Sequence, residues 1–498
     1  MIYNFHHFDY WVRGGLEYAQ AYRAKIFRNI GLEAKFIFAT VFPEGNIQKE
    51  TSTVGFLDSE VLWLYSFFSD CKIAPTTYTL ERLEDTFENR NFIISKTDEI
   101  VKYDFPSKNM YYTAHLSDAT KGFVDRVELI CNACLIRRDH YTYCRIYSEY
   151  FAPLNGYAHL YSRRYFNEDG SLAYEELIDN DMVLYRFQDR LIYSRDELVG
   201  YMLSCLNLTD QDWILIDSSR GSIDPAVVIQ NAFPAKIGLI IHENHFIEGD
   251  TDAKHILWHQ HYEYAFSHTD RISFFVTSTE IQSRLLREQF QKYNGIIPKV
   301  VTIPAGGLDK IQISDTPRKK NSLITASRLA MEKNIDLLID AVVEARKQIS
   351  DLSLDIYGKG YKEAELKEQI EKKHCGSYVT LCGHQKLDEV YQKYEAYISA
   401  STGETFGITL LEAVGAGLPI IGFDVRYGNQ VFIDDEKNGY RILWKYGRRK
   451  DEYIKDLARG IVRLFMEDNV KKFREQSYKK AQLYSTEEIE KRWKTILG

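Results

Sequence analysis

The chain has 498 residues, of which 45% are hydrophobic and 27% charged, a composition typical of globular proteins with about three domains. Its formal net charge of −8 disfavours a nucleic-acid partner, because a phosphate-binding surface needs clustered Lys and Arg. The first residues do not have the pattern of a signal peptide, and no apolar run reaches the ~20 residues of a membrane span. We therefore expect a cytoplasmic protein with at most peripheral membrane association.

Residues 1–55 are predicted to form the first part of a Rossmann-like domain. The sequence LEYAQAYRAKIFRNI, after the pair Gly14-Gly15, spaces its apolar residues along one face of a helix. Gly31 follows where such a helix would end. The next segment, KFIFATVF (35–42), has the nearly continuous apolar character of a buried strand.

The segment 56–205 has a different pattern, which predicts an inserted antiparallel β-meander that acts as an add-on domain. A helix is expected first, at EVLWLYSFFSD (60–70). Aromatic-rich stretches then recur about every ten residues, with turn pairs such as Asn155-Gly156 between them. The many Tyr and Phe side chains either fill the strand faces or form a surface for a partner or an extended acceptor polypeptide. The pattern alone does not separate these two interpretations.

The α/β pattern resumes after the meander. Residues 206–305 are predicted to complete the first Rossmann-like domain, and residues 306–480 to form a second one that binds a nucleotide-sugar. Apolar strands such as LPIIGFD (418–424) support this assignment. Residues 481–498 are expected to form a helix that packs back on the N-terminal lobe. Two doubly wound domains predict a ligand cleft between them, at the carboxyl ends of the strands.

The seven cysteines have irregular spacing, which is typical of reduced thiols in a cytosolic protein. Cys131 and Cys134 form a C-x-x-C pair. A zinc or redox site would need a second such pair or a βαβ context. We therefore predict no metal site from the cysteines.

Two basic residues follow a predicted strand. Arg328 and Lys333 lie in TASRLAMEKN, on a turn and at the start of a helix. A helix N-terminus attracts anions, Arg adds a planar fork of donors and Lys adds a compact charge. The pattern favours a diphosphate site over two solvated surface cations. Further on, DIYGKG ends a strand in a turn where Gly358 and Gly360 let the backbone approach a ligand.

The strongest motif is STGETFGITLLEAVGAGLPIIGFD, which contains two acids separated by seven residues. Glu404 is predicted to lie in a loop, and Glu412 about two turns inside the helix that Phe406 and Gly407 lead into. Carboxylates accept hydrogen bonds from sugar hydroxyls, so Glu404 can meet a hexose and Glu412 a ribose. The N–H groups of 406–408 would lie at the helix N-terminus, where a phosphate is stabilised.

These motifs resemble the retaining GT-B glycosyltransferases of family 4: S-R-L-x-x-x-K, Y-G-x-G, and Glu-x7-Glu followed by G-x-P. GLEYAQAYR, GFLDSE, KIAPTT, the Tyr-rich meander and GFDVRYGNQVFIDD (422–435) extend the resemblance over nearly the whole chain. They resemble the A subunits of accessory-Sec glycosyltransferases, which start O-glycosylation of serine-rich repeat adhesins in Gram-positive bacteria. Teichoic-acid α-N-acetylglucosaminyltransferases are more distantly similar. The resemblance implies a GT-B fold of class α/β, with two Rossmann-like doubly wound domains and the inserted meander.

The resemblance also implies roles for individual residues. Arg328 and Lys333 would hold the diphosphate of a UDP-sugar and replace a metal, so we expect neither a metal nor another cofactor. His242, at the end of a strand, would face the transferred sugar, with His245 as the less favoured neighbour. The catalytic set is then His242, Arg328, Lys333 and Glu404. The remaining donor-binding positions are Gly14 and Gly15 beside the diphosphate, Gly358, Gly383 and His384 near the uracil, Phe406, Gly407 and Ile408 at the sugar and phosphate, and Glu412 at the ribose.

The route of the reaction follows from the same resemblance. A double displacement would need a carboxylate close below the anomeric carbon, and the sequence identifies none. The resemblance implies front-face attack, in which the leaving phosphate accepts the proton of the acceptor.

The leading functional hypothesis is a retaining, UDP-sugar-dependent protein O-glycosyltransferase that moves N-acetylglucosamine to Ser or Thr of serine-rich repeat adhesins. One alternative is the same reaction with glucose from UDP-glucose. A second is a teichoic-acid polymer α-glycosyltransferase, and a third is a non-catalytic acceptor-binding subunit of a glycosyltransferase complex. Expected partners are a UDP-sugar, a serine-rich acceptor protein, and either further copies of this chain or a paired B-type glycosyltransferase subunit.

Overall fold

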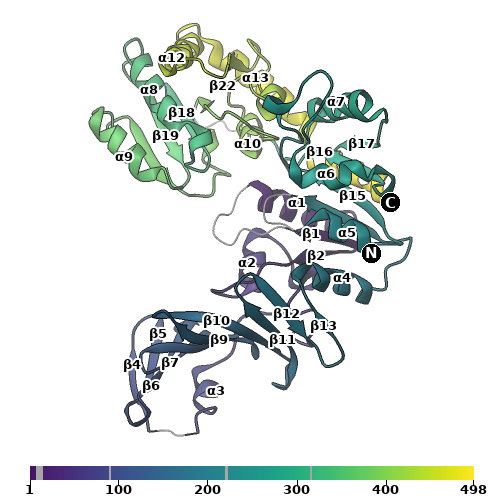
Figure 1. Cartoon of the computed structure of the whole chain (residues 1–498). Helices are drawn as coiled ribbons and strands as arrows, with labels where there is room; N and C mark the ends of the chain where they lie inside the picture. Colours follow the sequence, from purple (N-terminus) through teal and green to yellow (C-terminus); the bar gives the residue numbers. More distant parts are fainter. Residues whose placement is uncertain (7–14, 89–90, 219–222, 314–316) are drawn as a thin grey trace. The chain divides into compact units, whose positions relative to one another are not determined.

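The computed structural model describes residues 1–6, 15–88, 91–218, 223–313 and 317–498 (Figure 1). The chain forms two compact units. The first unit consists mainly of residues 31–240, with 258–273, and the second mainly of residues 274–498, with 15–30 and 241–257. Among the described residues, no helix is both long and apolar enough to cross a membrane.

A seven-stranded sheet confirms the first Rossmann-like domain. Its strands lie in the order β17 (Val300–Thr302), β16 (Phe274–Thr277), β15 (Lys236–Ile241), β14 (Trp213–Ser218), β1 (Ile2–His6), β2 (Ala34–Phe38) and β3 (Val61–Trp63). The pairs of β1 with β14 and β2, of β2 with β3 and of β16 with β17 are parallel. The helices of this part of the chain are α1 (Gly15–Asn29), α2 (Ile47–Val54), α4 (Arg195–Cys205), α5 (Pro225–Asn231), α6 (Gln260–Ser267) and α7 (Glu280–Gln289).

The helix predicted at 60–70 is wrong. Val61–Trp63 form the edge strand β3, in which Val61 lies opposite Phe36 of β2, and turns follow it. Val61 and Trp63 are buried while Leu62 between them is only half-buried, which is the alternation of a strand. Pairing with the buried strand β2 has therefore overridden a local apolar pattern that is compatible with a helix.

A ten-stranded antiparallel sheet confirms the predicted meander. Its strands lie in chain order: β4 (Ile93–Lys96), β5 (Ile100–Phe105), β6 (Met110–Asp118), β7 (Phe123–Cys131), β8 (Cys134–Tyr141), β9 (Arg145–Leu154), β10 (Tyr157–Phe166), β11 (Leu172–Asp179), β12 (Met182–Arg186) and β13 (Leu191–Ile192), with α3 (Leu80–Glu84) before them. Asn155 and Gly156 both have positive φ, as a tight hairpin requires. Cys131 lies opposite Cys134 across another two-residue hairpin, so the C-x-x-C pair is part of a β-turn.

One face of the meander is filled by stacked aromatic rings. The ring centroids lie 4.0 Å apart for His140 and Tyr147, 5.5 Å for Tyr147 and Tyr165, and 4.5 Å for Tyr165 and Tyr174. All four side chains are almost completely buried, whereas Tyr157, at the tip of a hairpin, is 80% exposed. A large share of the tyrosines therefore fills the sheet, and a smaller share remains accessible.

A row of alternating charges, which we call the charge ladder, runs across five neighbouring strands on the same face as the rings. Its side chains pair across each strand boundary at 3.0 to 3.2 Å, in the order Glu128, Arg138, Glu149, Arg163 and Glu176. Burial by itself would raise the pKa of Glu149, but hydrogen bonding and charge from His140 and the charge of Arg163 lower it to about 2. The ladder thus allows charged residues to lie inside the sheet.

A six-stranded parallel sheet forms the core of the second unit and confirms the second Rossmann-like domain. Its strands lie in the order β20 (Val379–Gly383), β19 (Ser353–Tyr357), β18 (Ser322–Ala326), β21 (Ala396–Ser399), β22 (Ile420–Phe423) and β23 (Gly439–Ile442). Two apolar cores lie on its two faces, because alternate residues such as Leu323 and Ile324 point to opposite sides. The helices are α8 (Ile335–Ala345), α9 (Glu363–Lys372), α10 (Ile408–Gly415), α11 (Gly428–Phe432), α12 (Lys450–Met466), α13 (Asn469–Ala481) and α14 (Thr486–Leu497).

The last helix, α14, packs against α1. The ring of Trp493 meets that of Phe27 edge-on at 5.3 Å, and the guanidinium of Arg23 lies 5.8 Å from the Trp493 ring centroid. At the other end of α1, the Asn29 amide donates to a Glu490 carboxylate oxygen at 2.7 Å. These contacts hold α1, whose first residue is Gly15, on the second unit.

Candidate active site

Lys333 and Glu404 form an ion pair in the second unit. Lys333 ends a short 3-10 helix between β18 and α8, and its ammonium donates to Glu404 Oε2 at 2.7 Å and to Ser401 Oγ at 3.3 Å. The two side chains are only 15% and 23% exposed. Arg328, on the turn before them, is 51% exposed and pairs with Glu332 at 3.0 Å. An exposed pair of this kind is weak, so Arg328 can exchange Glu332 for an anionic ligand.

The glycines of the turn after β19 are required by a close contact between loops. A Cβ atom at Gly358 would lie 1.8 Å from the carbonyl oxygen of Ser327, and one at Gly360 would lie 2.4 Å from that of Leu329. The N–H of Gly358 also donates to the carbonyl of Gly383 at 2.9 Å. The loops that follow β18, β19 and β20 therefore touch through their backbones, and His384 extends this group as an exposed side chain.

Gly407 sets where α10 begins. It has a left-handed φ of 88° and is the N-cap of the helix, which starts at Ile408. Glu412 consequently lies about one turn inside α10, so the predicted depth of two turns is wrong. Gly407 has no side chain that could cap the helix, so the first N–H groups of α10 remain oriented toward a ligand site.

Two neighbours complete the start of α10. The Phe406 ring is buried against Phe432, with ring centroids 5.3 Å apart, so its backbone is the part that a ligand can reach. Gly15 lies against Ile408: a Cβ atom at Gly15 would be 3.9 Å from Ile408 Cδ1. The structure thus brings the N-termini of α1 and α10 together. Gly14, the other predicted glycine, lies outside the described residues.

Glu412 has a partner that sequence reasoning missed. The hydroxyl of Tyr391 donates to Glu412 Oε2 at 2.9 Å. Burial raises the pKa of Glu412 to about 7, although the hydrogen bond from Tyr391 acts in the opposite direction. Tyr391 lies on a short 3-10 turn with no motif around it, so no sequence signal could have identified it.

His242 immediately follows the last residue of β15 and is half-buried, at the strand end where it was predicted. His245 is completely buried, and its Nε2 lies 2.6 Å from Oε1 of Gln289. Burial lowers the pKa of His245 to about 4, so this ring is neutral at physiological pH. His245 is therefore part of the packing, and His242 remains the candidate that faces a ligand.

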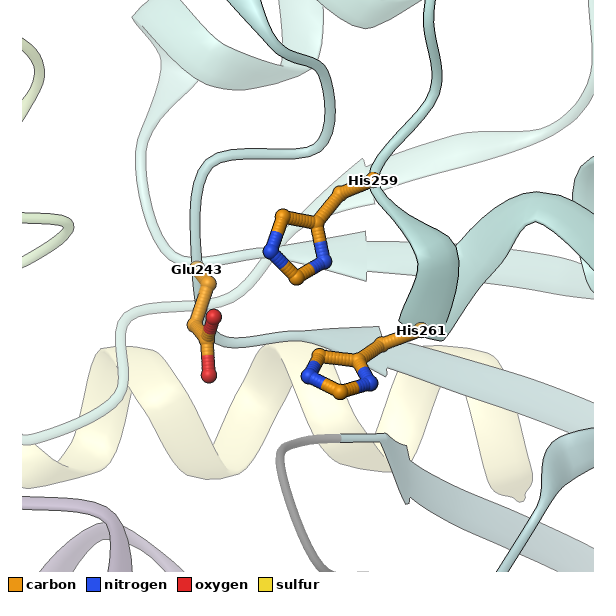
Figure 2. Close-up of side chains that lie close together, drawn as sticks. All are labelled: Glu243, His259 and His261. Atoms are coloured by element: carbon orange, nitrogen blue, oxygen red, sulfur yellow. The ribbon is translucent and has the colours of Figure 1, made fainter.

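Glu243, the next residue, lies near His259 and His261 at the start of α6 (Figure 2). One ligand atom from each of the three side chains lies within 4.8 Å of the others. Two imidazoles and a carboxylate are a donor set that suits zinc and other first-row divalent ions. It is the one group of this kind within the described ranges. The chemistry proposed below does not pass through it.

The fold and the site together define a GT-B glycosyltransferase: two doubly wound sheets, with basic residues and a Glu-x7-Glu pair grouped around the start of one helix. The profile of the family Glycosyl transferases group 1 matches residues 309–482, and that of the GtfA extended beta-sheet domain matches residues 91–189. The UDP-N-acetylglucosamine–peptide N-acetylglucosaminyltransferase GtfA subunit of Streptococcus gordonii is 44% identical over 98% of this chain and 96% of its own length. This chain belongs to the family of GtfA subunits.

Two solved structures agree with this assignment. The pneumococcal O-GlcNAc transferase GtfA in complex with UDP and GlcNAc is 40% identical, with a TM-score of 0.94 over 100% of this chain and 98% of that one. A GtfA/B complex contains a chain that is 44% identical, with a TM-score of 0.92 over 100% of this chain and 98% of that one. The predicted family and the predicted GT-B fold with its added meander are confirmed.

Proposed function

We propose that this enzyme transfers N-acetylglucosamine from UDP-N-acetylglucosamine to Ser or Thr hydroxyls of a serine-rich acceptor polypeptide, with retention at the anomeric carbon. The observation that carries the proposal is the ion pair of Lys333 and Glu404 beside the uncapped N-terminus of α10. Full-length relatives named for this activity support the choice of donor and acceptor class. The transferred sugar is then N-acetylglucosamine rather than glucose.

The basic residues supply what a metal supplies in other transferases. Arg328 and Lys333 bind the diphosphate, and the first N–H groups of α10 bind one of its phosphates. As the bond to the sugar breaks, negative charge grows on the departing phosphate, so these groups stabilise the transition state more than the ground state. We therefore propose that transfer needs no divalent ion, and we expect EDTA to leave the initial rate unchanged. A rate that falls with EDTA and returns with zinc or magnesium would contradict this.

The remaining residues hold the donor. Glu412 binds the ribose hydroxyls, the loop at Gly383 and His384 lies by the uracil, and Gly14 and Gly15 leave room beside the diphosphate. Glu404 and His242 contact the sugar. In the reaction, the acceptor oxygen forms its bond to C1 on the face from which UDP leaves, and the acceptor proton passes to an oxygen of the departing β-phosphate. No protein nucleophile takes part, because the carboxylate nearest the site, Glu404, is held by Lys333.

The same proposal covers the setting of the enzyme. The acceptor is a serine-rich repeat adhesin, modified in the cytoplasm, and the chain works with a paired B-type glycosyltransferase subunit. The solved GtfA/B complex, which contains a chain 44% identical to this one, supports such a pairing. Size measurements of the purified chain with and without a B-type subunit distinguish this pairing from self-association.

The experiment that tests the function measures initial rates with UDP-N-acetylglucosamine and UDP-glucose, using a serine-rich peptide as acceptor. We expect transfer with the first donor, and a large loss in Glu404→Gln and in Arg328→Ala. Undiminished transfer in both variants would refute the assigned site. Transfer from UDP-glucose alone would refute the donor, and transfer to a teichoic-acid polymer but not to the peptide would refute the acceptor.

A further inference from the structure

The motif GFDVRYGNQ has no role in the site described so far, although its backbone holds Glu404 in place. Tyr427 is almost completely buried and lies between β22 and α11. The N–H groups of Tyr427 and Gly428 both donate to the carbonyl of Glu404, at 2.8 and 2.6 Å, and the N–H of Glu404 donates to the carbonyl of Arg426 at 3.2 Å. The motif therefore fixes the main chain at Glu404.

The side chain of Tyr427 reaches a different segment, the one that begins with His242. Its hydroxyl donates to Asn244 Oδ1 at 2.6 Å, across 183 residues of sequence. The Asn244 amide nitrogen donates to the carbonyl of Phe246 at 2.8 Å, which turns the amide oxygen toward Tyr427. The ring of His245 lies nearly parallel to that of Tyr427, with centroids 6.4 Å apart. Burial raises the pKa of the Tyr427 phenol, so the hydroxyl remains a donor at physiological pH.

Two further contacts show that this position is tightly constrained. A Cβ atom at Gly428 would lie 2.1 Å from the carbonyl oxygen of Phe406, so only glycine allows the motif to approach the loop that precedes α10. Beside Tyr427, Arg426 pairs with Glu248 at 3.3 Å, which ties the motif a second time to the segment after His242. Backbone and side chain thus hold two segments that each carry a residue of the site.

We infer that Tyr427 is a positioning residue of the transfer reaction: it fixes the segment of His242 against Glu404 and, through Glu404, against Lys333. This inference rests on the proposed function, because the group that is positioned is the one expected to face the sugar. The groups expected to hold UDP do not contact the Tyr427 hydroxyl. Loss of the hydroxyl should therefore lower kcat by about tenfold, below the ~10²-fold cost of a 1 Å misplacement, without weakening UDP binding.

The test uses Tyr427→Phe, which removes only the hydroxyl. The matched control is Tyr440→Phe, because Tyr440 is a buried tyrosine of the same unit whose hydroxyl accepts from the Asn469 amide at 3.0 Å, outside the site. We measure kcat and KM with UDP-N-acetylglucosamine, the Kd of UDP by calorimetry, and hydrogen exchange of residues 241–248. In Tyr427→Phe we expect a lower kcat, an unchanged Kd and faster exchange in that segment, with none of these changes in the control.

A second variant tests the hydrogen bond itself. Asn244→Ala should reproduce the loss of kcat, and the double variant with Tyr427→Phe should be no worse than either single variant, because the two changes remove the same interaction. Additive losses would overturn the inference. So would a wild-type kcat in Tyr427→Phe, a parallel loss of kcat and UDP affinity, or unchanged exchange at 241–248. The exchange measurement needs no substrate, so a wild-type enzyme that is inactive with UDP-N-acetylglucosamine would refute the proposed function alone.

Discussion

Replacing Lys333 with Met tests the candidate site most directly. The change keeps the length of the side chain and removes only the ammonium that lies 2.7 Å from Glu404 Oε2. If that ammonium stabilises the charge that develops on the departing diphosphate, kcat should fall ~10²–10³-fold. This corresponds to the roughly 2.7–4 kcal/mol lost when one donor aimed at a developing anion is removed.

The same substitution has a separate effect on stability. It leaves the half-buried carboxylate of Glu404 without its cation, and an unsatisfied group of this kind costs about 1–3 kcal/mol of unfolding free energy. In the double variant Lys333→Met/Glu404→Gln, the unpaired charge is gone. We therefore expect the double variant to recover most of the lost Tm while its kcat remains low.

The two effects are read from two assays: initial rates of transfer from UDP-N-acetylglucosamine to a serine-rich peptide, and thermal unfolding without ligand. A kcat of Lys333→Met within about tenfold of wild type would refute the role of the ammonium in the transition state. Recovery of both activity and Tm in the double variant would show that the single variant loses activity only through the stranded carboxylate.

Three further predictions follow from individual contacts. UDP should bind more tightly as the pH rises through about 7, because the ribose hydroxyls donate to ionised Glu412, whose pKa burial raises to about 7; Tyr391→Phe should move this midpoint upward in calorimetric titrations, and an unchanged midpoint would contradict the contact. The pKa of Glu149 is lowered to about 2, so its contribution to stability is present at neutral pH and is lost as the pH falls from about 4 to about 2. Glu149→Gln should therefore flatten this part of the acid-unfolding curve, and a curve with the wild-type slope would speak against the ladder. Gly358→Ala should lower both the Tm and the affinity for UDP, because its Cβ would lie 1.8 Å from a backbone oxygen; a wild-type Tm would show that the loop relaxes freely.

The parts of the fold that sequence predicts well are those whose local pattern and tertiary setting agree. The apolar strands β14, β15, β18 and β22 lie where their hydrophobic runs indicate, since buried parallel strands need apolar residues on both faces. The helix predicted at 60–70 fails because pairing with β2 outweighs local periodicity. Glu412 lies one turn nearer the start of α10 than predicted, because the left-handed backbone of Gly407 delays the helix.

The meander shows why one strand went unpredicted. β11 reads LAYEELID, and two adjacent acids do not suggest a strand. Glu175 and Glu176 are both buried there, each held by arginines from neighbouring strands. A partner that is distant in sequence makes these acids acceptable, so single-sequence reasoning has no means of finding it. The contact of Tyr391 with Glu412 was missed for the same reason.

In the candidate site, the motif residues were the predictable part. Lys333 and Glu404 meet as their shared motif suggests, and Gly15 lies next to Ile408. The residues that hold those motifs in place, such as Tyr427, belong to no general chemical pattern. They are identified by hydrogen bonds that only the folded chain makes.

The charge ladder also has a consequence for how the meander finds its correct strand alignment. A shift of two residues between β9 and β10 would keep apolar faces together, so packing alone discriminates weakly against it. The same shift would move Glu149 away from Arg163 and strand both charges inside the sheet. The ladder therefore acts as an error check during assembly. Because it spans only β7 to β11, strands should be gained or lost in related proteins at the outer edges, near β4 and β13, where no rung has to be matched.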